Sequence, residues 1–142
     1  RSRRRPVRRL PQRRPRSRAA AAGGAEVAVR IVLLGAPRTP DEGVRLGTVR
    51  RPPRGVRKLE LAGRDFYDAW LPLLAPSEAL LKSRPAAGDD ARRWKSFASR
   101  YRAEMDRGDA ARLLDALALL SQTANFSVGC YCADEARCHR SI

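Results

Sequence analysis

The chain has 142 residues, of which 43% are hydrophobic, and a formal net charge of +15. This length fits one domain, and no apolar run approaches the roughly 20 residues that a membrane span requires. The three cysteines are an odd number and two are separated by one residue, which excludes a secreted disulfide framework. A reducing cytoplasm is the simplest compartment for such a chain, and we expect no membrane association.

Residues 1–25 differ in composition from the rest of the chain. They hold ten arginines, prolines, an alanine run and no acidic residue. Without apolar periodicity this Arg/Pro/Ala-rich tail is expected to be disordered. One interpretation is a nucleic-acid-binding arm, because arginines neutralise phosphates. The missing initiator methionine favours the other interpretation, a dispensable extension translated from upstream of a true start, with a single α/β domain at residues 26–142.

Two candidate strands open the domain. Val27–Gly35 is a short β-branched run that ends in glycine, which predicts a buried strand of an α/β sheet. After a loop rich in proline and glycine, Val44–Val49 alternates partially and predicts a weaker strand. A basic segment follows, in which Pro52 and Pro53 forbid a helix and fix an extended path.

Positive charge gathers on this fixed backbone, at Arg50, Arg51 and Arg54. A run of charges is by default a solvated loop. A loop stiffened by two prolines also loses little conformational entropy on binding, so the same residues fit an anion clamp. Both interpretations stay open at this stage.

Helices are expected in the middle of the chain. Asp65 is a candidate N-cap for a helix over residues 66–71, which Pro72 limits. Ser77 can cap a short helix over residues 78–82. Asp89 or Asp90 can cap a longer amphipathic helix that ends near Arg107. Asp109 can then begin a helix that extends to about Ser121.

The last predicted strand, Phe126–Cys132, carries two of the cysteines. Side chains alternate along a strand, so Cys130 and Cys132 point the same way, with Cα atoms about 6.6–6.8 Å apart. That separation is at the limit of what a disulfide spans, so an easy bridge is not expected. Gly129, on the other face, permits close approach by another element.

Beyond Cys132, an acidic turn leads into Arg137, Cys138, His139 and Arg140, which are predicted to begin a helix. Ligands bind outside the carboxyl ends of strands in open α/β sheets, and helix N-termini favour anions. We therefore expect a pocket here. Its anion-binding residues are predicted to be Arg50, Arg51, Arg54, Arg137 and Arg140.

Several segments resemble one known family. They are Thr48–Gly55, Trp70–Ser77, Arg100–Met105, Gly129–Cys132 and Arg137–Ser141. In this order they resemble the YeaO-like proteins of bacteria and archaea, the domain of unknown function 488. The resemblance implies a small Rossmann-like α/β domain but no assigned reaction. Members usually continue through a C-terminal helix, whereas this chain stops at Ile142, so we expect that helix to be lacking and the sequence to be a fragment.

Three functions and a structural alternative compete for the C-terminal motif. A pocket that binds an anionic small molecule or nucleic acid uses the arginines. Thiol-dependent catalysis, similar to sulfur transfer, uses Cys132 as nucleophile with Cys138 and His139 as the other candidate catalytic residues. A zinc site uses Cys130, Cys132, Cys138 and His139 as ligands. Alternatively, the cysteines only pack as small hydrophobes.

For the fold, these patterns predict an α/β class with a mostly parallel sheet flanked by helices. The strands near Val29–Leu34 and Phe126–Cys132 should lie side by side at its centre, because both are apolar runs between helical segments.

Overall fold

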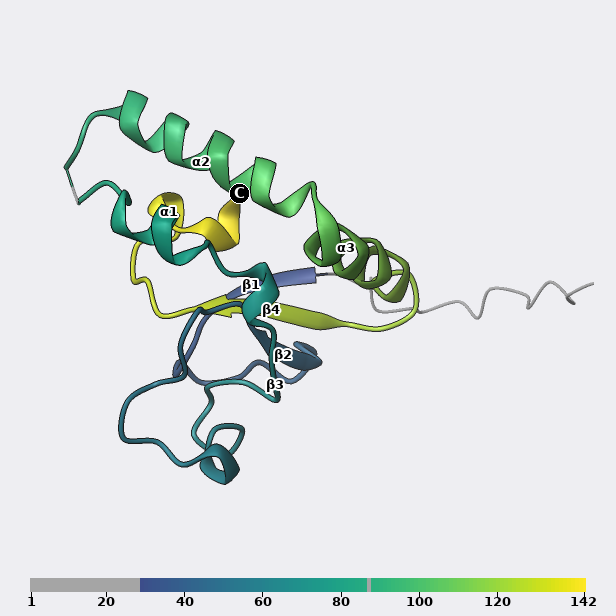
Figure 1. Cartoon of the computed structure of the whole chain (residues 1–142). Helices are drawn as coiled ribbons and strands as arrows, with labels where there is room; N and C mark the ends of the chain where they lie inside the picture. The colour runs from purple at the N-terminus through teal and green to yellow at the C-terminus, as the bar shows by residue number, and fades with distance from the viewer. Residues whose placement is uncertain (1–28, 87) are drawn as a thin grey trace, which may run out of the picture.

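A parallel four-stranded sheet organises the described chain. The computed structural model in Figure 1 describes residues 29–86 and 88–142, so the predicted tail at residues 1–25 lies outside it. The strands are β1 (Val29–Leu33), β2 (Val44–Gly47), β3 (Ala69–Trp70) and β4 (Phe126–Cys130), in the order β1-β4-β2-β3. Every pairing is parallel. The predicted α/β class with a mostly parallel sheet is therefore confirmed.

In the described part of the chain, three α-helices and four 3₁₀ helices accompany the sheet. The α-helices are α1 (Glu78–Lys82), α2 (Ala91–Met105) and α3 (Gly108–Leu120). The 3₁₀ helices are η1 (Lys58–Glu60), η2 (Pro72–Leu74), η3 (Glu135–Arg137) and η4 (His139–Ser141). Figure 1 shows α1, α2 and the C-terminal segment on one side of the sheet, and the loop between β2 and β3 on the other. No helix in the described ranges is long and apolar enough to span a membrane.

Two of the predicted N-caps are confirmed. The Ser77 side chain accepts a hydrogen bond from the backbone N–H of Leu80, at the start of α1. The Asp90 side chain accepts one from Arg92 at the start of α2. Each bond satisfies a backbone donor that has no partner inside its helix.

The helix predicted over residues 66–71 is wrong. Asp65 has φ +58°, in the left-handed region, and Ala69–Trp70 forms β3 beside β2. Asp68 and Leu71 donate backbone hydrogen bonds to the carbonyls of Arg45 and Gly47. Six residues ahead of a proline are too few to overcome the cost of helix nucleation, so pairing with the edge of β2 is favoured.

The two apolar strands do lie side by side, because β1 pairs with β4 from Val29↔Phe126 to Leu33↔Cys130. Only β4 is central, however, and β1 is at an edge. Val29, Ile31 and Leu33 are 47%, 41% and 37% exposed, so the prediction of β1 as a buried, central strand is wrong. An apolar run identifies a strand but does not specify how many neighbours that strand has.

A buried ion pair joins the loops around β2. Arg45 and Glu42 are 1% and 2% exposed, and their side chains form two bonds, of 2.5 and 2.8 Å. Arg45 also donates to the carbonyls of Ala36 and Asp65, at 2.8 and 2.5 Å. Glu42 accepts from the hydroxyl of Ser127 in β4, at 2.7 Å. Every nitrogen of the Arg45 guanidinium group and both carboxylate oxygens of Glu42 therefore have a hydrogen-bond partner, as buried charges require.

Candidate functional site

The three cysteines converge at the carboxyl end of β4. The strand ends at Cys130 rather than at Cys132, and the chain bends there, which brings the sulfurs of Cys130 and Cys132 to 3.5 Å. Cys138 lies between η3 and η4. The three Sγ atoms are all within 4.8 Å of one another, and all three cysteines are free. This convergence is closer than a regular strand through Cys132 would allow.

The predicted helix start at Arg137–Arg140 is wrong. Cys138 has φ −125° and ψ 142°, which is extended backbone between two single-turn 3₁₀ helices. Gly129, by contrast, fits the predicted close approach. A Cβ there would lie 2.2 Å from a Leu34 methyl group, so the side chain that follows β1 packs directly on the backbone of β4.

The three thiols differ in environment. Cys138 is fully buried, Cys130 is 6% exposed, and Cys132 is half-buried in a cavity wall. Hydrogen bonds from the Cys130 and Cys138 thiols, opposed by burial and assisted by Arg84, lower the pKa of Cys132. The bond to Cys132 raises the pKa of Cys130, and bonds to Cys130 and then to Cys132 raise the pKa of Cys138. Cys132 is therefore the sulfur of the three that carries negative charge most readily.

His139 lies beside the cluster as a neutral ring. Its Nε2 is 2.7 Å from the carbonyl oxygen of Thr48, and because a carbonyl only accepts, Nε2 carries the proton. Nδ1 is then unprotonated and lies 3.8 Å from the sulfur of Cys138. Burial lowers the pKa of His139. His139 is not within the 4.8 Å group that the three sulfurs form.

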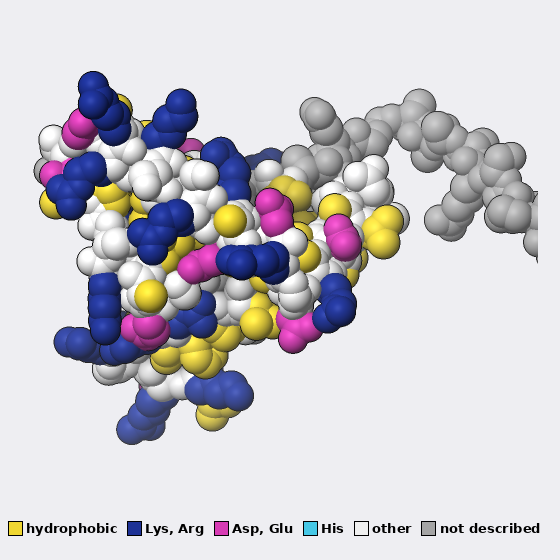
Figure 2. Space-filling view, turned by 45° about the horizontal axis from the view of Figure 1, so that its top comes forward, with side chains coloured by type: hydrophobic (Ala, Val, Ile, Leu, Met, Phe, Trp, Pro, Cys, Tyr) yellow, Lys and Arg dark blue, Asp and Glu magenta, His cyan; other side chains and the backbone are white. Residues whose placement is uncertain are grey.

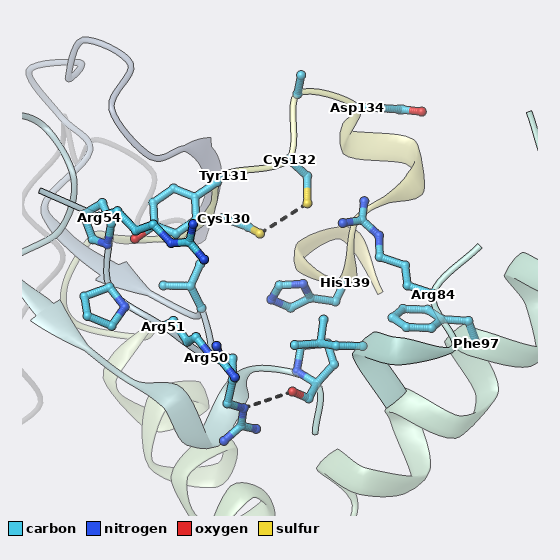
Figure 3. Close-up of a pocket in the computed structure, with 16 residues that line it drawn as sticks. Arg50, Arg51, Arg54, Arg84, Phe97, Cys130, Tyr131, Cys132, Asp134 and His139 are labelled. Carbon is cyan, nitrogen blue, oxygen red and sulfur yellow. Dashed lines mark hydrogen bonds between the residues drawn. The ribbon is translucent and has the colours of Figure 1, made fainter. Parts of the chain in front are cut away.

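A cavity of about 620 Å³ opens above Cys132 (Figure 3). Its charged lining residues are Arg50, Arg51, Arg54, Arg84 and Asp134. The apolar part of its wall consists of Pro52, Pro53, Leu81 and Phe97. The rings of Tyr131 and His139 also line the cavity. The prolines that suggested a stiff basic loop thus do form one side of a cavity.

The arginines of the wall differ in how much of their hydrogen-bonding capacity is used. Arg50 donates to the carbonyls of Ala75 and Pro76, and Arg51 pairs with Glu78 on the surface at 3.0 Å. Arg54 has no hydrogen-bond or ion-pair partner in the described part of the chain. Arg54 is therefore the wall cation with the most capacity left for a ligand.

Sequence reasoning missed Arg84. It lies just after α1, and one of its terminal nitrogens donates to the carbonyl of Arg137 at 3.0 Å. Figure 3 shows its guanidinium group and the sulfur of Cys132 pointing toward one another. No motif marks this residue, because only the packing of the α1 segment against the C-terminal segment brings it to the cavity.

Arg137 and Arg140 lie outside the cavity lining. The side chain of Arg140 is 3% exposed and donates to the carbonyls of Val32 and Cys130, at 2.8 and 3.0 Å. Arg140 thereby ties the C-terminal segment to the ends of β1 and β4. The guanidinium carbon of Arg137 lies 5.9 Å from the ring centroid of Trp94. In this structure both make contacts within the protein, and the predicted arginine set meets the cavity only through Arg50, Arg51 and Arg54.

Comparison with known proteins identifies the family. The model of DUF488-N3a, described as the active DUF488-N3 subclade, matches residues 29–142. The chain therefore belongs to this family, and its resemblance to the YeaO-like proteins is confirmed. Neither a curated protein nor a solved structure matches the chain.

Proposed function

We propose that this member of the DUF488-N3a family binds an anionic, phosphate-bearing ligand in the arginine-lined cavity above Cys132. One observation carries the proposal. Four guanidinium groups line a single cavity, and among its described lining residues Asp134 is the only carboxylate. The carboxylate of Asp134 points away from the cavity centre (Figure 3). Arg51 is paired with Glu78, but Arg54 and Arg84 have no carboxylate partner in the described part of the chain, so their charge is available to a ligand.

Arg54 and Arg84 are the residues we assign to direct contact. A guanidinium group presents planar, paired donors that match a phosphate, and such charge-assisted bonds are roughly twice as strong as neutral ones. Pro52 and Pro53 hold the Arg54 loop in an extended path, so little ordering is needed on binding. The apolar residues of the wall lower the polarity beside these arginines, which strengthens their attraction for an anion.

The size of the cavity fits a small molecule. Ligand pockets span roughly 300–1,000 Å³, and this one has about 620 Å³. Tyr131, which is 37% exposed, offers a ring for stacking on a base. A nucleotide monophosphate combines both features. The same phosphate chemistry is present in a nucleic acid, and Figure 2 shows several Lys and Arg side chains spread over one face of the molecule.

Thermal unfolding in the presence of anions tests this assignment. Inorganic phosphate and adenosine monophosphate should raise the midpoint of the wild type, because a ligand present at 100 times its Kd stabilises the native state by about 2.7 kcal/mol. Arg54→Ala should lose most of that shift. Arg57→Ala removes the same charge from the same loop but lies outside the lining, so it should keep the shift.

Equal shifts of the unfolding midpoint in the two variants would mean that the anions only screen the charge of a basic protein. That result would refute the proposed binding site. A short single-stranded oligonucleotide serves as the third probe. If it stabilises the wild type while the mononucleotide does not, the ligand is a nucleic acid rather than a small molecule. In that case the stabilisation should fall steeply with salt.

Thiol chemistry by Cys132 is the second candidate function. The sulfur of Cys132 lies in the cavity wall beside Arg84, within reach of a ligand that the arginines hold. A thiolate next to a cation is the form in which cysteine acts as a nucleophile. The anion-binding role does not depend on this thiol chemistry.

A further inference from the structure

The cysteine cluster has the dimensions of a metal site. A tetrahedral zinc ion with Zn–S bonds of about 2.3 Å holds its sulfurs about 3.8 Å apart. The sulfurs of Cys130 and Cys132 are already 3.5 Å apart, and no pair in the cluster exceeds 4.8 Å. Side-chain rotations that move Cys138 by about 1 Å would therefore complete the triangle. Three thiols packed only to fill space do not need to point at one another.

The local charges suit a thiolate–metal complex. Three thiolates around a zinc ion carry one net negative charge. Arg140, whose side chain is 3% exposed, bonds to the carbonyl of Cys130, and its nearest carboxylate is Glu135 at 4.0 Å. Arg84 lies on the other side, beside Cys132. A negative complex at the cluster would offset both cations.

We propose that Cys130, Cys132 and Cys138 together bind one zinc ion and leave its fourth coordination position open to the arginine-lined cavity. Cys132 places the ion at the cavity wall, and His139 lies outside the sulfur group. Binding forms three sulfur–metal bonds and releases to solvent the protons that the thiols carry. Three protein ligands and one open position are typical of catalytic rather than structural zinc. The proposal of zinc binding depends only on the arrangement of the three sulfurs. The access of an anion to the fourth coordination position depends in addition on the proposed function.

Titration of the reduced, chelator-treated protein with Co²⁺ tests the site. We expect visible absorption bands of a tetrahedral, thiolate-rich complex that saturate at one ion per chain, and their loss when Zn²⁺ displaces the cobalt. Cys132→Ser and Cys138→Ser should each weaken binding by at least the roughly 10–100-fold that loss of a mere supporting contact costs. Circular dichroism checks that each variant is folded.

A matched control distinguishes the effect of the cysteine arrangement on metal binding from the effect of the number of thiols. Ser99 is an exposed residue of α2, so the double variant Cys132→Ser/Ser99→Cys keeps three thiols but scatters them. It should bind as weakly as Cys132→Ser. Binding as tight as that of the wild type, or no tetrahedral spectrum in the wild type, would overturn the proposal. Because no anion enters these measurements, their failure leaves the comparison of Arg54 and Arg57 variants intact.

Discussion

Replacing Glu42 by alanine should lower the free energy of unfolding by about 3–5 kcal/mol, the usual cost of leaving one member of a buried ion pair without its partner. In the variant, Arg45, which is 1% exposed, would have no carboxylate partner and would keep only its bonds to backbone carbonyls. It would also remove the acceptor of the Ser127 hydroxyl in β4. Urea unfolding measures the change directly.

Glu78→Ala is the matched control for this experiment. It also removes a carboxylate paired with an arginine, but Arg51 and Glu78 are 75% and 54% exposed. Surface pairs contribute about 0–1 kcal/mol, so its stability should barely change. If both variants lost the same small amount, the Glu42–Arg45 pair would not be the buried anchor of these loops.

The same pair gives an acid dependence. Bonds from Arg45, then Ser127, lower the pKa of Glu42 from 4.5 to about 2 against the effect of burial. A carboxyl group whose pKa is lower in the folded state stabilises the fold fully above its unfolded pKa. Its contribution should therefore be lost as the pH falls from about 4.5 towards 2. Wild type and Glu42→Ala should converge in stability over that range.

Cys132 should lose much less of its reactivity with iodoacetamide between pH 8 and pH 6 than an ordinary thiol does, in reduced protein freed of metal. Bonds from the Cys130 and Cys138 thiols lower its pKa, so a larger fraction of thiolate remains at pH 6. An ordinary thiol with a pKa near 8.5 would slow roughly 75-fold over the same interval. Mass spectrometry of the labelled peptide identifies the cysteine that reacts.

Zinc provides the control for that experiment. An ion held by the three sulfurs should protect Cys132 from alkylation, and chelation should restore its reactivity. Cys132→Ser should remove the fast phase altogether. A rate that falls with pH as for a free thiol would contradict the assignment of negative charge to Cys132 and remove support for the thiol candidate.

Local signals in the sequence predict much of the structure. Ser77 and Asp90 cap helices because their side chains satisfy backbone donors a few residues away. The apolar runs identify β1 and β4, and the position of the cysteines at a strand end locates the candidate site. All of these depend on residues close together in the chain, where periodicity and capping chemistry act.

What the sequence did not predict depends on distant contacts. β3 forms because β2 offers unpaired backbone groups to residues 69–70, a pairing that the composition of 66–71 does not reveal. β1 lies at an edge of the described sheet, with β4 as its neighbour. Its apolar residues identify a strand but do not determine whether a second strand pairs with it. Arg84 reaches Cys132 only through tertiary packing, and Arg140 turns inward to the carbonyls of Val32 and Cys130.

A crystal structure of the protein with bound tungstate tests the central claim most directly. Tungstate mimics phosphate in charge and shape, and its anomalous scattering identifies it without ambiguity. The account predicts a tungstate ion inside the cavity, in contact with the guanidinium groups of Arg54 and Arg84 and above the sulfur of Cys132. Tungstate bound only at surface arginines outside the cavity, with the cavity filled by water, would contradict it.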